Sequence, residues 1–296
     1  MAEGLEKRGS GMITKEDKKG NSPKGLFVGL CTKDIVYYTD EIPGKNHKIK
    51  TDDFATYIGG PAANAAITYA ALGGDATLAT CLGVGPESEA MVKELNAYGV
   101  KVLNYADYET TPNTACILVA KDGSRSIISG QHPFTPNRTF DISAFDFILF
   151  DCNQQEISQD ILAKSQGQTI VLDAGSVKPG IEAFLQKADI VIASEDFRGA
   201  MGEGLFRMQC DAPHKAVTHG ERPILYNGKE LSVSKVTAVD TLGAGDIFHG
   251  AFCYGRFHLG KTVEEALLFA AEVAGESVKY RGPREWIKSV SVTRLI

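Results

Sequence analysis

Short apolar runs recur along the whole chain, and segments with helical patterning lie between most of them. The runs contain few polar residues and no strict alternation, which is typical of strands buried on both faces. Buried strands that alternate with amphipathic helices predict βαβ units, and therefore a mainly parallel sheet with helices on both sides. We expect a three-layer α/β/α domain with strands at 25–30, 75–83, 145–151, 169–173, 188–194 and 214–220, and helices at 62–74, 87–99, 158–167, 180–188, 246–260 and 262–279.

Two segments, residues 34–60 and 113–130, break this order. Both are rich in β-branched and aromatic residues with polar residues between them, and the second contains the turn signal Asp122-Gly123. We expect antiparallel strands outside the main sheet. An appendage of this kind can cover the site of an α/β enzyme or join two subunits. We therefore expect a small β-strand lid within these two segments and a homodimer formed through it.

Composition excludes several classes of protein. The 296 residues carry a net charge of −6 with a pI near 5.6 and no basic stretch, so we expect no nucleic-acid partner. No stretch approaches the roughly 20 apolar residues of a membrane helix, so we expect no membrane partner. Residues 1–24 have charges but no apolar core, which is unlike a secretory signal. We interpret them as a disordered leader that precedes one folded domain at 25–296.

The cysteines are widely scattered, at positions 31, 81, 116, 152, 210 and 253. They show neither a CxxC pair nor the His-paired spacing of a zinc site. Reduced, mostly buried thiols are typical of a cytoplasmic protein, and we expect that location.

Polar side chains follow the predicted strands at the point where each strand ends. Ligands of open parallel sheets bind outside the carboxyl ends of the strands, so these side chains would line one crevice. The alternative is that they only cap turns and helices, because loops are polar in any protein. The residues in question are Asp34, Asp151, Asn153, Asp173, Ser194 and Thr218.

The stretch from Asp240 to Asp246 reads DTLGAGD and precedes an apolar segment with helical patterning. Each glycine costs roughly 1 kcal/mol against alanine inside a helix, so Gly243 and Gly245 indicate a tight turn. A helix that begins near Asp246 would add free N–H groups and a positive dipole end, which together form an anion hole. Asp246 is either the N-cap of that helix or a carboxylate that takes a proton from an attacking hydroxyl group. The second interpretation predicts phosphoryl transfer to an alcohol.

This string resembles the DTxGAGD signature of the ribokinase (PfkB-type) carbohydrate kinase family. Residues 57–85 are similar to the family's Gly-Gly signature, and the resemblance extends over about residues 25–285. It implies a ribokinase-like fold with Asp246 as catalytic base and an anion hole for the γ-phosphate formed by Gly243, Ala244 and Gly245. The sugar would be bound by Asp34, Gly59, Gly60 and Asn64.

The resemblance also implies ATP and Mg²⁺ as cofactors, with K⁺ as a further cation. Thr218 and Gly220 resemble the family's TxG element, which contacts the nucleotide phosphates. Asp240 and Thr241 match positions where many members bind a monovalent cation, usually potassium. The chain departs from the family's N-x-x-E motif, since the matching positions read Ser194-Glu195-Asp196-Phe197. We expect Glu195 or Asp196 to substitute in part for that motif, and Ser194 and Glu195 to bind the nucleotide.

Together these features predict an ATP-dependent kinase that phosphorylates a hydroxymethyl group of a small sugar or sugar derivative. The segments "GLCTKDIVYY" and "DIFHGAF" are most similar to ketohexokinase-like and sulfofructose-kinase-like members of the family. The alternatives are a nucleoside kinase of the same fold and a non-catalytic sugar- or nucleotide-binding protein. An NAD-dependent oxidoreductase is disfavoured because no GxGxxG follows the first strand.

Four further residues have two interpretations each. His249 lies one helical turn after Asp246 and either reaches a ligand or is a hydrogen-bonded core histidine. Trp286 either stacks on adenine or packs in the core, and we favour packing. Arg125 and Arg138 either meet an anionic group of the substrate or lie on the solvated surface.

Overall fold

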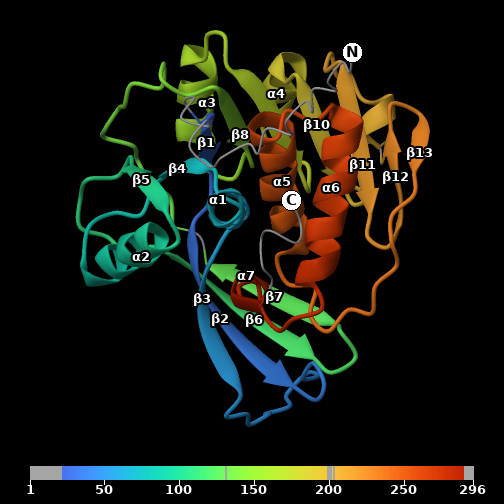
Figure 1. Cartoon of the computed structure of the whole chain (residues 1–296). Helices are drawn as coiled ribbons and strands as arrows, with labels where there is room; N and C mark the ends of the chain where they lie inside the picture. Colours follow the sequence, from blue (N-terminus) through green and yellow to red (C-terminus); the bar gives the residue numbers. More distant parts are fainter. Residues whose placement is uncertain (1–21, 131, 199–201, 203, 290–296) are drawn as a thin grey trace, which may run out of the picture.

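The computed structural model describes residues 22–130, 132–198, 202 and 204–289, which form two sheets (Figure 1). The larger sheet has nine strands in the order β13-β12-β11-β10-β9-β8-β1-β4-β5. Neighbours are parallel from β5 to β11, and β12 and β13 form an antiparallel edge. Its strands are β1 (Lys24–Val28), β4 (Asp75–Thr80), β5 (Val100–Asn104), β8 (Phe147–Phe150), β9 (Thr169–Ala174), β10 (Ile190–Ser194), β11 (His214–His219), β12 (Arg222–Tyr226) and β13 (Lys229–Leu231).

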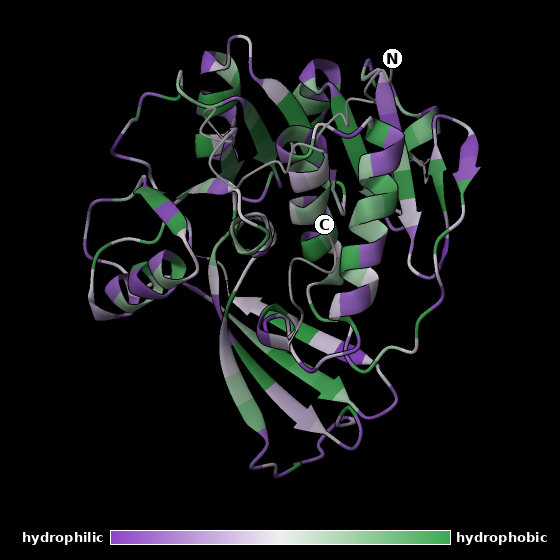
Figure 2. Cartoon of the chain, viewed as in Figure 1, coloured by the Kyte–Doolittle hydropathy of each residue, from purple (hydrophilic) through white to green (hydrophobic). Residues whose placement is uncertain are grey.

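The predicted parallel sheet is confirmed, and each of the six predicted strands is present. The strands β5, β12 and β13 are additions to that prediction. They lack a continuous apolar run because β5 and β13 are the two edges of the sheet and β12 lies next to an edge, and all three are partly exposed, as Lys101, Arg222 and Lys229 show. Hydrophobic residues gather in the central strands, and hydrophilic residues gather in the loops (Figure 2).

Helices cover both faces of this sheet. Alternate residues of β8 point to opposite sides: Phe147 and Leu149 join a core with α1, α5 and α6, while Ile148 and Phe150 join a core with α3 and α4. The three predicted layers are therefore confirmed. The helices are α1 (Pro61–Ala71), α2 (Pro86–Ala97), α3 (Gln155–Lys164), α4 (Ile181–Lys187), α5 (Ala244–Cys253), α6 (Val263–Ser277) and α7 (Glu285–Ser289), with a 3₁₀ turn η1 (Leu205–Arg207) and a π turn η2 (Tyr254–His258).

A second sheet of four strands, which we call the lid sheet, projects from one end of the main sheet (Figure 1). Its order is β3-β2-β6-β7, with β2 (Thr32–Thr39), β3 (Phe54–Gly59), β6 (Asn113–Ala120) and β7 (Arg125–Gly130). The expectation of antiparallel strands is wrong for one pair, because β2 and β6 are parallel. Between them the chain passes through β3, α1, β4, α2 and β5, so β6 can enter the lid sheet in the same direction as β2.

The described residues include only the last part of the predicted leader. Residues 1–21 lie outside the described residues. Lys24, which the sequence places in the leader, already belongs to β1, and the Pro23 carbonyl accepts a hydrogen bond of 2.9 Å from Tyr69 Oη.

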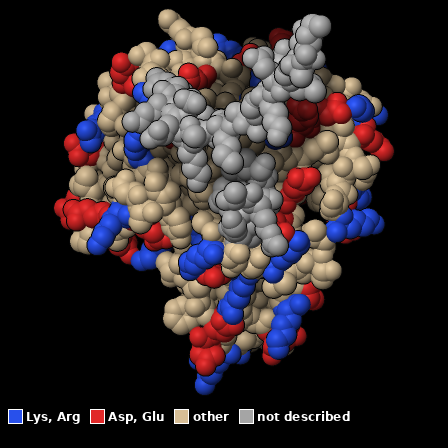
Figure 3. All heavy atoms as spheres, in the orientation of Figure 1, with Lys and Arg blue, Asp and Glu red and all other residues tan. Residues whose placement is uncertain are grey.

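None of the helices in the described part of the chain combines the length and the apolarity needed to span a membrane. Acidic and basic side chains are interspersed over the face seen in Figure 3.

Candidate active site

The first turn of α5 has backbone N–H groups that no side chain caps. Gly243 is the N-cap residue and has a φ of 73°, a left-handed conformation that favours glycine. No side chain caps the helix, so N–H groups of its first turn are available to a ligand. The interpretation of Asp246 as the N-cap is wrong, because the helix begins at Ala244 and Asp246 is its third residue.

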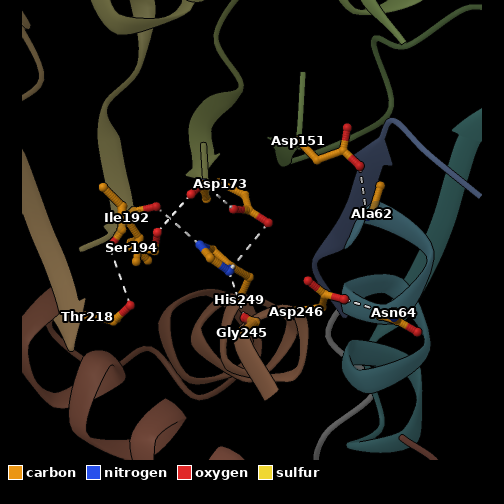
Figure 4. A network of polar contacts seen from close by, with 12 residues as sticks. Ala62, Asn64, Asp151, Asp173, Ile192, Ser194, Thr218, Gly245, Asp246 and His249 are labelled. Carbon is orange, nitrogen blue, oxygen red and sulfur yellow. Dashed lines mark hydrogen bonds and ion pairs between the residues drawn. The ribbon is translucent and has the colours of Figure 1, made fainter. Parts of the chain in front are cut away.

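Asp246 is held by a residue from a distant part of the chain. Asn64, on α1, donates a hydrogen bond of 2.7 Å from Nδ2 to Asp246 Oδ2 (Figure 4). Burial raises the pKa of Asp246 to about 7, the Asp173 carboxylate adds to this, and the bond from Asn64 lowers it. A carboxyl group with a pKa near neutrality is suited to accept a proton at physiological pH.

A buried arginine completes this arrangement. Arg284 is 3% exposed, and its Nη2 donates to Asn64 Oδ1 and, at 2.8 Å, to the Ile58 carbonyl. Burial lowers the pKa of Arg284, while the negative charges of Asp246 and Asp34 raise it. The sequence prediction missed this residue. The only sequence signal for it is the charged pair Arg284-Glu285 in "GPREW". Charged residues lie on the surface in most proteins, so this signal did not predict a buried arginine.

Asp34 lies on β2 and is 9% exposed. Thr32 Oγ1 donates to its Oδ1 at 2.6 Å. Burial raises the pKa of Asp34 to about 6, and the bond from Thr32 and the charge of Arg284 lower it. Gly59 on β3 pairs with Thr32 on β2, and a Cβ at Gly59 would collide with the Asp34 carboxylate. Gly60 is the N-cap of α1. The Gly-Gly pair therefore makes room for Asp34 and begins the helix that carries Asn64.

Asp151 has a different role from the one that its place at a strand end suggested. Its Oδ2 accepts from the backbone N–H groups of Leu30 at 2.9 Å and Ala62 at 3.0 Å, and its Oδ1 accepts from Asn153 N at 2.8 Å. Burial raises its pKa. The carboxylate thus joins the end of β1 to the start of α1, and the interpretation as a residue that caps turns is favoured for Asp151.

The predicted nucleotide residues lie at the ends of the neighbouring strands β10 and β11 (Figure 4). Ser194 Oγ donates to the Gly175 carbonyl at 2.7 Å, and Thr218 Oγ1 donates to the Ala193 carbonyl at 3.3 Å. Glu195 forms an exposed ion pair with Arg222. The structure therefore does not bring Glu195 into the network around Asp246. Gly220 occupies the turn after β11 with a φ of 63°.

The predicted metal residues are engaged by hydrogen-bond donors. Asp240 accepts from Leu242 N at 2.9 Å, from Gly282 N at 2.9 Å and from Tyr38 Oη at 3.2 Å. The Thr241 carbonyl accepts from Arg125 Nη1 at 2.9 Å and from Ala244 N at 3.2 Å. These donors occupy the oxygen atoms that would bind a potassium ion, so the two residues as arranged here do not fit one.

Magnesium has a different requirement. Within the described ranges, no group of three or more His, Cys, Asp or Glu side chains is gathered as a metal site. Mg²⁺ keeps several waters and is commonly held by substrate phosphates with one or two carboxylates, so it needs no protein cage of its own. The carboxylates at the ends of β9 and β10 are already engaged, since Asp173 accepts from Gly175 N at 3.1 Å and Glu195 is paired with Arg222, so neither is assigned to magnesium.

The structure also shows the surroundings of His249, Trp286 and Arg138, for which the sequence left two interpretations each. His249 is 6% exposed and hydrogen-bonded, as expected for a core histidine. Trp286 is buried and donates to the Pro283 carbonyl at 3.2 Å, so the prediction that it packs is confirmed. The Arg138 guanidinium lies 5.1 Å from the centre of the Phe140 ring.

Comparisons with known proteins agree with this architecture. The sequence pattern of the pfkB family carbohydrate kinases matches residues 23–289. The chain is 28% identical over 275 residues to the ribokinase of Bacillus subtilis, covering 85% of this chain and 91% of that protein. It is 24% identical over 295 residues to the ketohexokinase of Mus musculus, covering 87% and 96%. The solved structure of Arabidopsis thaliana ribokinase complexed with ribose and ATP superposes with a TM-score of 0.71 at 22% identity, covering 93% and 98%, which shows a ribokinase-like fold.

Proposed function

Since the chain belongs to the pfkB family of carbohydrate kinases and is an ATP-dependent sugar kinase, we propose that it phosphorylates a hydroxymethyl group with Asp246 as the general base. The observation that carries this proposal is the 2.7 Å bond from Asn64 to Asp246 in the open first turn of α5. It places an oriented carboxylate of raised pKa beside N–H groups that suit a phosphate.

In the proposed reaction, the hydroxyl oxygen of the sugar attacks the γ-phosphorus of ATP in line with the bond to the leaving ADP oxygen. Asp246 takes the hydroxyl proton as the new P–O bond forms and the bond to ADP breaks. Gly243 and Gly245 would supply backbone N–H groups to the transferring phosphoryl group, and Ala244 would do so only by giving up its 3.2 Å bond to the Thr241 carbonyl. A magnesium ion bound mainly by the nucleotide phosphates would supply positive charge that offsets part of theirs.

Asp34 and Asn64 are proposed to bind hydroxyl groups of the sugar. Asp34 is buried, and Thr32 donates to its Oδ1. Its other carboxylate oxygen, Oδ2, can accept a hydrogen bond from a sugar hydroxyl. Arg284 supports both residues, because it binds Asn64 directly and its charge favours the ionised form of Asp34. The shared influence of the buried Arg284 charge on Asp34 and Asp246, and its bond to Asn64, support a sugar bound next to the proposed base.

The lid sheet is proposed to close over the sugar and exclude water, which would otherwise compete as phosphoryl acceptor. Two of its side chains already reach the loop before α5. Tyr38 on β2 binds Asp240, and Arg125 on β7 binds the Thr241 carbonyl. A movement of the lid sheet would therefore be transmitted to the anion-binding turn.

The outer face of the lid sheet supports the proposed homodimer. Phe54 on β3 is 59% exposed beside Tyr37, with ring centres 5.8 Å apart, and Ile128 on β7 is 71% exposed. Residue pairing across the strands puts all three on the same face. Because an apolar face of this kind is a candidate interface, we expect Ile128→Lys to convert a dimer into a monomer in analytical ultracentrifugation. A wild-type monomer would contradict the proposal.

The test of the proposed reaction is ADP release measured across ketoses, aldoses, nucleosides, sugar acids and sugar phosphates, with magnesium and with or without potassium. We expect turnover with a small sugar and loss of it in Asp246→Asn. Turnover with nucleosides alone would favour a nucleoside kinase of the same fold. A ligand-induced rise of the melting temperature without ADP release would favour a non-catalytic binding protein.

A further inference from the structure

His249 lies directly behind the anion-binding turn and is not used by the proposed reaction. It is on α5, one turn after Gly245, and its Nδ1 lies 2.8 Å from the Gly245 carbonyl oxygen (Figure 4). On the other side of the ring, Nε2 lies 3.3 Å from the carbonyl oxygen of Ile192 on β10. One buried side chain thus connects the first turn of α5 to the main sheet.

The same ring also faces the end of β9. Asp173 Oδ2 lies 3.6 Å from His249 Nδ1, and Asp173 Oδ1 accepts from Gly175 N at 3.1 Å. The Gly175 carbonyl in turn accepts from Ser194 Oγ at 2.7 Å. His249 is therefore connected through Asp173 and Gly175 to Ser194, one of the residues proposed to contact the nucleotide.

The bond to Gly245 has a geometric consequence for the anion site. A carbonyl oxygen only accepts, so the 2.8 Å bond requires a proton on Nδ1. The Gly245 carbonyl and the Asp246 N–H belong to one planar peptide unit and point in opposite directions. Fixing the carbonyl therefore fixes the direction of the Asp246 N–H, which belongs to the open first turn of α5.

We propose that His249 is a positioning residue for phosphoryl transfer: it orients the Gly245–Asp246 peptide, and with it the anion hole and the base, relative to strands β9 and β10. The inference rests on the proposed role of Asp246. It assigns to His249 an effect on the chemical step, because the ring contacts the Gly245 carbonyl next to the proposed base, the Ile192 carbonyl and the Asp173 carboxylate.

His249 also acts on the charge of Asp246. The groups that influence this carboxyl are Asp173 after β9 and Asp151 after β8, which raise its pKa, and Asn64 on α1 and His249 on α5, which lower it. The Arg284 guanidinium, before α7, interacts with it as well. Replacing His249 with a neutral side chain is therefore expected to raise the pKa of Asp246.

The experiment compares three substitutions in the full-length enzyme. His249→Asn keeps an N–H donor on the same γ-carbon and can still bind the Gly245 carbonyl. His249→Gln moves the donor outward, and His249→Leu removes it. We expect turnover to fall about 10- to 100-fold in the Gln and Leu variants, with KM for ATP and sugar unchanged, and to stay within about threefold in the Asn variant. In all three variants the acid limb of the pH profile should move to higher pH, because the charge of His249 lowers the pKa of Asp246.

Cys253→Ala is the matched control, because Cys253 is fully buried one turn further along the same helix. It should lower the melting temperature without moving the pH profile. Equal turnover in the Asn and Gln variants, or an unchanged acid limb in all three, would overturn the inference while Asp246→Asn still tests the base itself. Should the Leu variant fail to fold, the Asn and Gln pair decides the question alone.

Discussion

The two halves of the candidate site differ in how far they are assembled without ligand. On the proposed sugar side, Asp34, Asn64 and Arg284 are at most 9% exposed; Arg284 donates a hydrogen bond to Asn64, and its charge lowers the pKa of Asp34. On the nucleotide side, the side chains of Glu195 and Arg222 are 44% and 59% exposed and pair with each other at the surface.

This difference follows from what each half has to do. Buried charges perturb one another strongly, so the sugar side can raise the pKa of a base and orient it before the substrate arrives. An exposed ion pair is screened by water and contributes little, which leaves the nucleotide side free to rearrange around a large, charged ligand. We therefore expect substitutions on the sugar side to affect the chemistry, and those on the nucleotide side to affect binding modestly.

The largest effect is expected from Asp246→Asn. The amide can still accept the bond from Asn64, so the fold should survive, but it cannot take a proton. Turnover should fall by about two to four orders of magnitude with little change in KM for ATP, measured by coupled ADP release. If the variant keeps the wild-type turnover, Asp246 is not the base and the sugar side loses its proposed function.

Asp34→Asn should have the next largest effect. A hydrogen bond from a sugar hydroxyl to a carboxylate is worth about 1.5–3 kcal/mol, so kcat/KM for the sugar should fall about 10- to 100-fold. KM for ATP should not change, because Asp34 is on β2 of the lid sheet, away from the strand ends that carry Ser194 and Thr218. A parallel rise of KM for ATP would show that the two halves are not independent.

The pH dependence of activity should be intermediate in size. Because burial raises the pKa of Asp246 to about 7, kcat/KM should fall about tenfold per unit as the pH drops below that value. Initial rates from about pH 5 to 9 in a constant-ionic-strength buffer would measure this. An acid limb near the ordinary aspartate value of about 4 would contradict the assignment.

The stability of the fold should depend on pH in the opposite direction from the activity. The folded protein holds the Asp246 proton more tightly than the unfolded chain does, so this stabilisation is complete below about pH 4 and is lost as the pH rises through about 7. Asp246→Asn should therefore melt like the wild type near pH 5 and at a higher temperature near pH 8.5. A variant that melts lower at both values would show that the ionised carboxylate stabilises the fold.

The smallest effect is expected on the nucleotide side. Arg222→Ala removes the exposed pair with Glu195 and should leave the melting temperature unchanged. KM for ATP should change by less than about fivefold, since the pair only holds Glu195 in one position. A loss of turnover as large as that of Asp34→Asn would show that the nucleotide side is as tightly organised as the sugar side.

Local patterns were sufficient for much of this protein. Continuous apolar runs predicted the central strands, because a strand buried on both faces must be apolar at every position. The DTLGAGD stretch predicted a glycine turn before a helix, and Gly243 adopts the left-handed conformation that such a turn requires. The prediction was wrong for Gly245, which is the second residue of α5 and not part of the turn. These features depend on neighbours in the chain, which the sequence displays directly.

Those local patterns could not predict contacts between segments that are far apart in the sequence. The parallel pairing of β2 with β6 depends on the path of the chain through five intervening elements. The burial of Arg284 against Asn64 and the three backbone donors on Asp151 depend on which helix lies over which strand end. The assignment of Asp246 is intermediate: its residue type and motif are local, but its raised pKa comes from burial and from the charge of Asp173, which exist only in the folded chain.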